Sequence, residues 1–238
     1  MSTPNAKSKS RFKGFTEGLF SALIAALIIR QLIVQAYTIP TPSMESSLLV
    51  GDFLLVNKFN YGMRTPDWIG IPYTKVGFDV PWYRFPSIRE PQPYDVTIFR
   101  YPKDHSMDYI KRLIAVGGQT LEVKDKQIFV DDQKFPTPPF SQYLDPRVFK
   151  RGMGKYAFPT FRNLGSRDNY GPITLPENKY WMMGDNRDDS ADSRIWGFVD
   201  HSEIVGQGLI IYFSWESKVP WSQFFNKIRF GRIGNVIR

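Results

Sequence analysis

The sequence predicts a mainly β protein: antiparallel sheets wrapped into a partial barrel, with a β-rich inserted subdomain and one preceding N-terminal transmembrane helix. Three observations predict this class. The only strongly apolar run lies near the N-terminus, over residues 19–36. After it, no long segment has helical periodicity. Instead, short segments rich in Val, Ile, Phe and Tyr are separated by Gly, Pro, Asn and Asp, which is typical of antiparallel sheets.

The composition bounds the class of protein. The chain has 238 residues, enough for one domain of about 200 residues and an anchor. Without cysteine there can be no disulfide, thiol nucleophile or cysteine-ligated metal. The net charge is +8, but the basic residues are scattered and no nucleic-acid motif occurs, so we expect no nucleic-acid partner. His105 and His201 lie in polar, loop-like contexts; we expect neither a metal nor a cofactor.

The N-terminal segment predicts a membrane anchor. Residues 1–14 are polar and basic, and an apolar helix is expected over residues 15–36. About 20 residues cross a bilayer core, a length that this run reaches if Arg30 extends to the interface or faces protein. The positive-inside rule then makes residues 1–14 a cytoplasmic tail and residues 37–238 an extracytoplasmic domain.

A cleaved signal peptide is the alternative for the same segment. The n-region is basic, the apolar stretch before Arg30 has the length of an h-region, and Arg30 with Gln31 fits a polar c-region. Val34 and Ala36 would then be the −3 and −1 residues of the cleavage site.

Seven strands are expected after the anchor. They are segments 52–59, 95–101, 109–116, 120–125, 126–132, 179–185 and 205–215. A hairpin turn is predicted at Asp125–Lys126. Two Pro-rich stretches, 62–94 and 135–178, do not fit a compact core. We expect 62–94 to be an extended loop and 120–178, which includes the hairpin, to form the inserted subdomain.

Aromatic residues make up 16% of the chain, and several lie in loops and near the C-terminus. They predict either packing in the core or in hairpins, or an apolar patch that enters lipid headgroups. The residues concerned are Trp82, Tyr83, Phe85, Trp215, Trp221, Phe224 and Phe225.

A serine and a lysine are the candidates for chemistry. Ser43 lies in the Pro-rich turn IPTPSMESSL, and Lys111 lies in the strand-like segment DYIKRLIAVGG. A serine nucleophile needs a base within hydrogen-bond reach, and without a suitable histidine a lysine is the next candidate. An ordinary lysine has a pKa near 10.4, which burial in apolar surroundings lowers. Taken alone, each would be ordinary: a turn serine and a solvated strand lysine.

The segment MMGDNRDDSADSRIWGFV (182–199) is rich in aspartate and arginine. It fails the calcium-loop pattern, because Arg187 falls at a ligand position, the turn glycine is missing and no glutamate closes the loop. We interpret it as an ion-paired turn that positions a side chain for an active site.

Together these segments resemble bacterial signal peptidase I. The resemblance is carried by IPTPSMESSL with VGDFLLVNKFNYG, by DYIKRLIAVGG, and by YGPITLPENKYWMMGDNRDDSADSRIWGFV, in the family's order behind an anchor. It implies a membrane-bound serine endopeptidase that removes signal peptides from exported preproteins after small residues at −1 and −3 (A-x-A). It also implies a single-pass protein of the bacterial cytoplasmic membrane, with its N-terminus in the cytoplasm and its catalytic domain on the periplasmic or extracellular side.

The resemblance also assigns catalytic roles. Ser43 is the nucleophile, Lys111 is the neutral general base, and the Ser43 amide with the Thr41 hydroxyl forms the oxyanion hole. Ser190 orients the Lys111 amine. The supporting residues are the ion pair Asp192–Arg194, together with Asp185 and Arg187, which hold the loop.

Substrate binding follows from the same resemblance. The substrate adds an extended strand to an edge that contains Asp108 and Tyr109. Small pockets are lined by Tyr37, Ile39, Met44, Leu48, Ile98 and Ile110. The implied partners are signal peptides of secretory preproteins and membrane lipids, with the secretion translocon as a further candidate.

Two positions depart from the family pattern. Pro42 stands where many members have glycine, so the turn must tolerate a fixed φ and a missing N–H. Ser46 stands where proline is frequent, which is expected to loosen the turn after Ser43. Neither change removes a catalytic group.

Two other functions are weighed against this one. A self-cleaving Ser/Lys repressor should have a DNA-binding domain where this chain has its apolar segment. A membrane-anchored, non-catalytic β domain that binds exported peptides would have no use for Ser43, Lys111 and Ser190 together.

Overall fold

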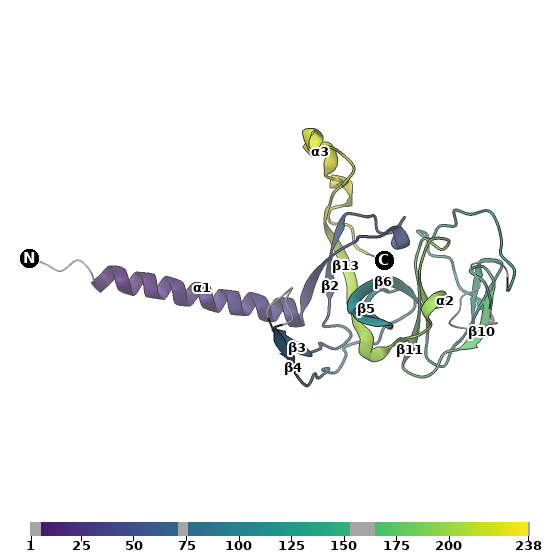
Figure 1. Ribbon diagram of the computed structural model, residues 1–238, viewed down its shortest axis with the longest axis horizontal. Coiled ribbons are helices and arrows are strands. Elements are labelled where there is room, and N and C mark those ends of the chain that lie inside the picture. The colour runs from purple at the N-terminus through teal and green to yellow at the C-terminus, as the bar shows by residue number, and fades with distance from the viewer. Residues whose placement is uncertain (1–5, 71–75, 153–164, 238) are drawn as a thin grey trace, which may run out of the picture.

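The computed structural model describes residues 6–70, 76–152 and 165–237, and the side chains of residues 6–13, 27, 28 and 30–32 lie outside this description. Its first element is helix α1 (Ala6–Leu32), which projects from a β-rich body (Figure 1). Among the described residues, no helix has both the length and the apolar character needed to cross a membrane. The side chain of Arg30 lies outside the described residues, so its expected position at the interface or against protein stays a prediction.

The helix ends earlier than residue 36, and strand β1 (Val34–Thr38) follows at once. The expected helical limit is wrong because β1 pairs along its whole length with β2 (Asp52–Asn57). Val34 and Ala36 are therefore held in a ladder, opposite Asn57 and Leu55. Removal of the N-terminal segment as a signal peptide stays an alternative prediction.

The main sheet of the described chain has seven antiparallel strands in the order β1-β2-β13-β5-β6-β11-β12. The remaining members are β5 (Val96–Tyr101), β6 (Asp104–Val116), β11 (Lys179–Met183), β12 (Val199–Asp200) and β13 (Ile204–Ser214). The mainly β, antiparallel prediction is confirmed. Strand β6 starts before residue 109 because it pairs with β5 as far as Asp104. The sheet has edges at β1 and β12, and its closure into a partial barrel stays a prediction.

A second sheet lies within residues 120–178, the range expected to form a subdomain. Its order is β10-β7-β8-β9, with β7 (Thr120–Lys124), β8 (Gln127–Val130), β9 (Gln133–Lys134) and β10 (Tyr170–Thr174). Lys124 pairs with Gln127, which leaves Asp125 and Lys126 as a two-residue turn with φ of 45° and 67°. These positive angles are those of the hairpin turn that the sequence predicts. Residues 153–164 lie outside the described chain.

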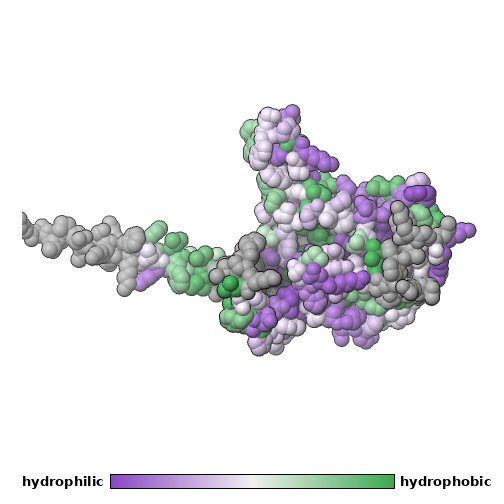
Figure 2. Space-filling model, viewed as in Figure 1, coloured by the Kyte–Doolittle hydropathy of each residue, from purple (hydrophilic) through white to green (hydrophobic). Residues whose placement is uncertain are grey.

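The stretch 62–94 is more than an extended loop. It contains a two-stranded ribbon of β3 (Trp68–Gly70) and β4 (Gly77–Asp79), whose connection at 71–75 lies outside the described residues. Figure 2 shows hydrophobic surface around this ribbon and along the described part of α1. Helix α3 (Phe224–Lys227) forms an arm that projects from the end of β13 (Figure 1).

Most of the loop and C-terminal aromatic residues are exposed, so packing in the core is wrong for them, although several of their rings pack against one another. The exposed members are Trp82, Tyr83, Phe85, Trp221, Phe224 and Phe225. Their entry into lipid headgroups stays a prediction.

Three buried clusters connect these parts. The first joins the two sheets, because Ile114 of β6 and Trp181 of β11 pack with Leu121 and Tyr170 of the second sheet. The second, around Phe99 and Trp196, supports helix α2 (Ser193–Trp196). The third lies beneath the segment that carries Ser43. The two sheets therefore share a core, and the segment that carries Ser43 rests on a cluster of the main sheet.

Candidate active site

Ser43 lies in a short 3₁₀ turn, Pro42–Met44, that follows the extended residue Thr41. Pro42 is the first residue of the turn, where the missing N–H is not needed and a fixed φ is suitable. Its carbonyl accepts a hydrogen bond of 2.8 Å from the Glu45 amide. The turn therefore tolerates the proline. Ser46 has a φ of 88°, a left-handed conformation that a proline could not adopt.

The turn rests on a buried apolar cluster. Ile39, Met44 and Leu48 pack with Leu54, Val96 and Ile211. These side chains, like Ile98, are at most 3% exposed. They fix the backbone around Ser43, whereas their contribution to substrate pockets stays a prediction.

Lys111 projects from β6 toward the serine. Its Nζ atom donates a 2.8 Å hydrogen bond to Ser43 Oγ and a 3.0 Å bond to the Ile110 carbonyl. The residue is only 4% exposed, and Nζ lies 5.4 Å from the centre of the Tyr109 ring. Burial lowers the pKa of Lys111 to about 8, although the negative charges of Asp192 and Asp185 act in the opposite direction. The alternative of a solvated strand lysine is wrong.

The two residues face a cleft of about 360 Å³. Residues 40–43 form one wall, Asp108 to Lys111 of β6 form another, and Asp189 and Ala191 complete the lining. The ladder between β11 and β6 ends at Met183 and Arg112, so among the described strands β6 has a free edge beside this cleft. An extended peptide could continue the position of β11 there.

Two other predicted residues lie close to this cleft. Thr41 Oγ1 is 3.4 Å from Ser43 Oγ, so the two hydroxyls lie close together. Tyr37 donates a 2.9 Å hydrogen bond to the Asp108 carboxylate. Burial and the Asp108 charge raise the pKa of Tyr37, which keeps its hydroxyl protonated.

Ser190 lies on the loop Gly184–Asp192, called here the 184–192 loop. The expected hydrogen bond to Lys111 is not formed: within the described chain, the buried Ser190 hydroxyl has no hydrogen-bond partner. The Lys111 amine is instead engaged by Ser43 and the Ile110 carbonyl. A Cβ atom at Gly184 would lie 2.2 Å from Ser190 Oγ and 2.4 Å from the Ser43 carbonyl oxygen. Glycine is thus required where the loop meets the turn that carries Ser43.

The two buried aspartates of this loop have different arginines as ion-pair partners. Asp192 and Arg194 form the predicted ion pair, at 2.8 Å, and both are buried. Asp192 also accepts a hydrogen bond from the Gly184 amide and caps α2. The Arg194 guanidinium and its hydrogen bonds hold the pKa of Asp192 below its ordinary value in spite of burial. This carboxylate therefore stays ionised.

Asp185 pairs with a residue that the sequence reasoning missed. Arg112 donates two hydrogen bonds to it, of 2.8 Å and 2.6 Å, and Ser47 donates a third of 2.5 Å. Arg187, by contrast, donates to Ser141 at 3.0 Å. An arginine inside the apolar strand segment after Lys111 was the available signal, because a buried arginine needs an acidic partner.

Comparisons with known proteins agree on one family. The model of the family "Signal peptidase, peptidase S26" matches residues 13–215. Signal peptidase I of Pseudomonas aeruginosa is 33% identical over 240 residues, which cover 93% of this chain and 78% of that protein. The Rickettsia rickettsii enzyme is also 33% identical, with coverages of 93% and 87%.

A third relative and one solved structure complete the comparison. Signal peptidase I of Aquifex aeolicus is 33% identical over 241 residues, covering 85% of this chain and 84% of that protein. The crystal structure of a signal peptidase I from Enterococcus faecalis has a TM-score of 0.38 and 24% identity. It covers 51% of this chain and 98% of its own.

Proposed function

Since this chain belongs to the signal peptidase family, peptidase S26, and is a signal-peptide-cleaving hydrolase, we propose that Ser43 and Lys111 perform the cleavage. The observation that carries the proposal is the 2.8 Å contact between Lys111 Nζ and Ser43 Oγ in a buried setting. A lysine with a pKa near 8 is partly neutral at neutral pH, so it can accept a proton.

The reaction proceeds through an acyl-enzyme. Neutral Lys111 removes the Ser43 hydroxyl proton while Oγ attacks the carbonyl carbon of the scissile bond. The Ser43 amide and the Thr41 hydroxyl donate hydrogen bonds to the oxyanion; loss of one such donor costs on the order of 3 kcal/mol of transition-state stabilisation. The charged lysine then gives its proton to the leaving amine, and a water molecule activated by Lys111 hydrolyses the ester.

The loop residues support the base in this proposal. The Ser190 hydroxyl, which has no partner among the described residues, turns toward Lys111 when the amine becomes charged and needs another acceptor. Asp192 with Arg194, and Asp185 with Arg112, keep the loop in place. Arg187 extends this support to Ser141.

Substrate choice follows from the shape of the cleft. The signal peptide adds a strand to the free edge of β6, beside Asp108, Tyr109 and Ile110. Small residues at −1 and −3 suit shallow pockets above the buried cluster beneath Ser43, which leaves no room for large side chains.

We further propose that α1 is a single-pass anchor in the bacterial cytoplasmic membrane, with a cytoplasmic tail and residues 37–238 outside. Its apolar side chains Phe15, Leu19, Phe20 and Leu23 are 55–69% exposed. The helical part of this anchor, residues 15–32, extends for about 27 Å at about 1.5 Å per residue, close to the thickness of about 30 Å of a bilayer core. Retention of the full chain in carbonate-washed membranes, with the β body digested by external protease, would support this topology; release would contradict it.

Cleavage of a detergent-solubilised preprotein tests the catalytic proposal. The wild type, Ser43→Ala and Lys111→Met are compared by sequencing the N-terminus of the product. Cleavage after an A-x-A site by the wild type alone is expected. Activity in Ser43→Ala would require another nucleophile, and a wild type that binds the preprotein in lipid without cleaving it would favour a non-catalytic domain.

A further inference from the structure

The 184–192 loop lies between the nucleophile turn and the inserted subdomain. On one side, the Asn186 amide donates to the Ser43 carbonyl at 3.2 Å, and its side-chain amide donates to the Pro42 carbonyl at 3.3 Å. On the other side, Gln142 exchanges backbone hydrogen bonds of 2.9 Å and 3.0 Å with Asp185 and Arg187. The loop therefore connects the subdomain segment to the backbone of Ser43 by hydrogen bonds on both of its sides.

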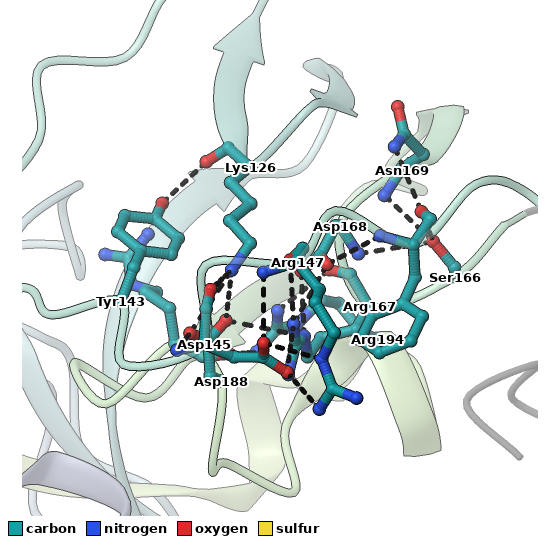
Figure 3. A network of polar contacts seen from close by, with 12 residues as sticks. Lys126, Tyr143, Asp145, Arg147, Ser166, Arg167, Asp168, Asn169, Asp188 and Arg194 are labelled. Atoms are coloured by element: carbon teal, nitrogen blue, oxygen red, sulfur yellow. Dashed lines mark hydrogen bonds and ion pairs between the residues drawn. The ribbon is translucent and has the colours of Figure 1, made fainter.

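Asp188, in the middle of this loop, is held by groups from the subdomain. Its side chain is 5% exposed and accepts hydrogen bonds of 3.1 Å and 3.3 Å from Lys126 Nζ. The Asp145 amide donates at 2.7 Å, and Arg167 Nε lies 3.4 Å away. Figure 3 shows Lys126 and Asp188 pointing toward one another from separate segments of the chain.

Lys126 is itself fixed in place. It occupies the left-handed second position of the β7–β8 turn. Tyr143 donates a 2.6 Å hydrogen bond to its carbonyl, and its own amide donates to the Asp168 carbonyl at 2.9 Å. Its ammonium also donates to the Asp145 carbonyl (Figure 3). The second sheet shares a core with β6, the strand of Lys111, so this lysine is attached to a rigid frame.

We propose that the ion pair between Lys126 and Asp188 positions the catalytic loop, so that the inserted subdomain holds Ser43 and Lys111 in register. The inference deepens the proposed function and rests on it. Asp188 lies two residues from both Asn186, which contacts the nucleophile turn, and Ser190, whose hydroxyl packs against Gly184. Without the Lys126 charge, the buried Asp188 carboxylate loses two hydrogen bonds and moves toward water, taking the loop with it.

The expected signature of a displaced loop is a higher pKa of Lys111, the proposed base. Lys111 is almost fully buried, and the 184–192 loop provides part of the cleft lining beside it. A displaced loop admits water to the ammonium, which favours the charged form. Because the neutral form is the active base, the acid limb of the pH–rate profile then moves to higher pH. Loss of a merely structural contact would leave that limb unchanged.

The experiment compares Lys126→Met with Lys124→Met in the full chain, in detergent, with a synthetic peptide that contains an A-x-A site. Lys124 is a matched control from the same hairpin: it is also ion-paired, to Glu122 at 2.7 Å, but it is 56% exposed. Lys126→Met should lower kcat at least about tenfold with KM within about threefold, and move the acid limb upward by about one pH unit. Lys124→Met should match the wild type, and Lys126→Arg should retain most activity because guanidinium also pairs with carboxylate.

The outcomes separate the two proposals. Equal activity and equal acid limbs in Lys126→Met and Lys124→Met overturn the positioning role, and so does a lowered kcat with an unmoved limb. Should Lys126→Met fail to fold, Asp188→Asn removes the same charge pair at constant size and must show the same shift of the limb. Wild-type cleavage that persists in Ser43→Ala would instead contradict the proposed function, whatever the lysine variants do.

Discussion

At the scale of the residue, Lys111 works against stability. Its folded-state pKa, about 8, lies below the 10.5 of an unfolded lysine, so the unfolded chain binds more protons between these pH values. Burial of the charged lysine therefore lowers the free energy of unfolding. This penalty is complete below pH 8 and decreases progressively up to about pH 10.5. The penalty is on the order of 1–3 kcal/mol.

Lys111→Met should accordingly raise the free energy of unfolding at pH 6 by on the order of 1–2 kcal/mol, since part of the gain is offset by the lost hydrogen bond to Ser43. The advantage should shrink as the pH rises from 8 to 10. Urea unfolding at pH 6 and pH 10 measures it. A variant that is less stable than the wild type at pH 6 would show that the lysine is not destabilised by burial.

Ser190 allows a second prediction at this scale. Its buried hydroxyl has no partner within the described residues, so Ser190→Ala should leave thermal stability unchanged or raise it by up to about 1 kcal/mol. Activity should nevertheless fall, though less than in Ser43→Ala, if the hydroxyl orients the charged amine during turnover. Melting curves and peptide cleavage test both parts. A marked loss of stability with unchanged kcat would give Ser190 a packing role alone.

The residue pairs also show where sequence reasoning stops. Ser43 and Lys111 could be paired through the motifs shared with a known family, although each taken alone would be ordinary, and they lie in contact. The ion-pair partner of Asp185 could not be predicted, because Arg112 is 73 positions away in the chain, whereas Arg187 is a near neighbour of Asp185. A carboxylate selects its arginine by burial and geometry in the folded state, and those follow from the register of β6 against β11.

At the scale of the element, alternation and turn chemistry were sufficient for seven of the thirteen described strands, whereas β1 and the short or insertion strands β3, β4, β9, β10 and β12 were not expected. The hairpin at Asp125–Lys126 forms where the sequence predicts it, because a two-residue turn between β-prone segments is a local signal. Strand β1 was missed because Val34–Thr38 continues an apolar run that reads as helix. Its conformation is decided by pairing with β2, which is a long-range effect that overrides local propensity.

The close approach of the 184–192 loop to the nucleophile turn makes Gly184 the most constrained position in this contact. Gly184→Ala should lower kcat at least about tenfold, because the added methyl would have to displace either the Ser43 carbonyl or the Ser190 hydroxyl. Gly18→Ala is the comparison, since a Cβ there meets nothing within 4 Å and the backbone of α1 is helical. Steady-state cleavage and melting curves check the pair. Wild-type kcat in Gly184→Ala would mean that this contact does not set the position of Ser43.

At the scale of the whole molecule, distant parts of the chain converge on one site. The second sheet reaches the 184–192 loop through Lys126, and the C-terminal segment reaches the residues after Ser43 through Arg232. Arg232 donates to both oxygens of Asp52 and, at 2.9 Å, to the Ser47 carbonyl. This arginine lies beyond the residues that the family model matches. Local sequence patterns therefore could not have assigned it a role.

The last prediction concerns this C-terminal contact. Asp52 is fully buried and also accepts hydrogen bonds from Ser214 at 2.6 Å and from the Leu49 amide at 2.8 Å. Arg232→Gln would leave this carboxylate without its counter-ion, so the free energy of unfolding should fall by about 2–4 kcal/mol. Arg151→Gln, which breaks an exposed pair with Glu122, should change it by less than about 0.5 kcal/mol.

Urea unfolding of the two variants measures the difference, and cleavage at a temperature where both are folded measures its consequence for the site. Because Arg232 holds the Ser47 carbonyl, and Ser47 in turn donates to Asp185, its loss should also lower kcat. Equal unfolding free energies in the two variants would show that the C-terminal segment only covers the sheet. A loss of stability with an unchanged kcat would confine its role to the fold and leave the positioning of Ser43 to the 184–192 loop.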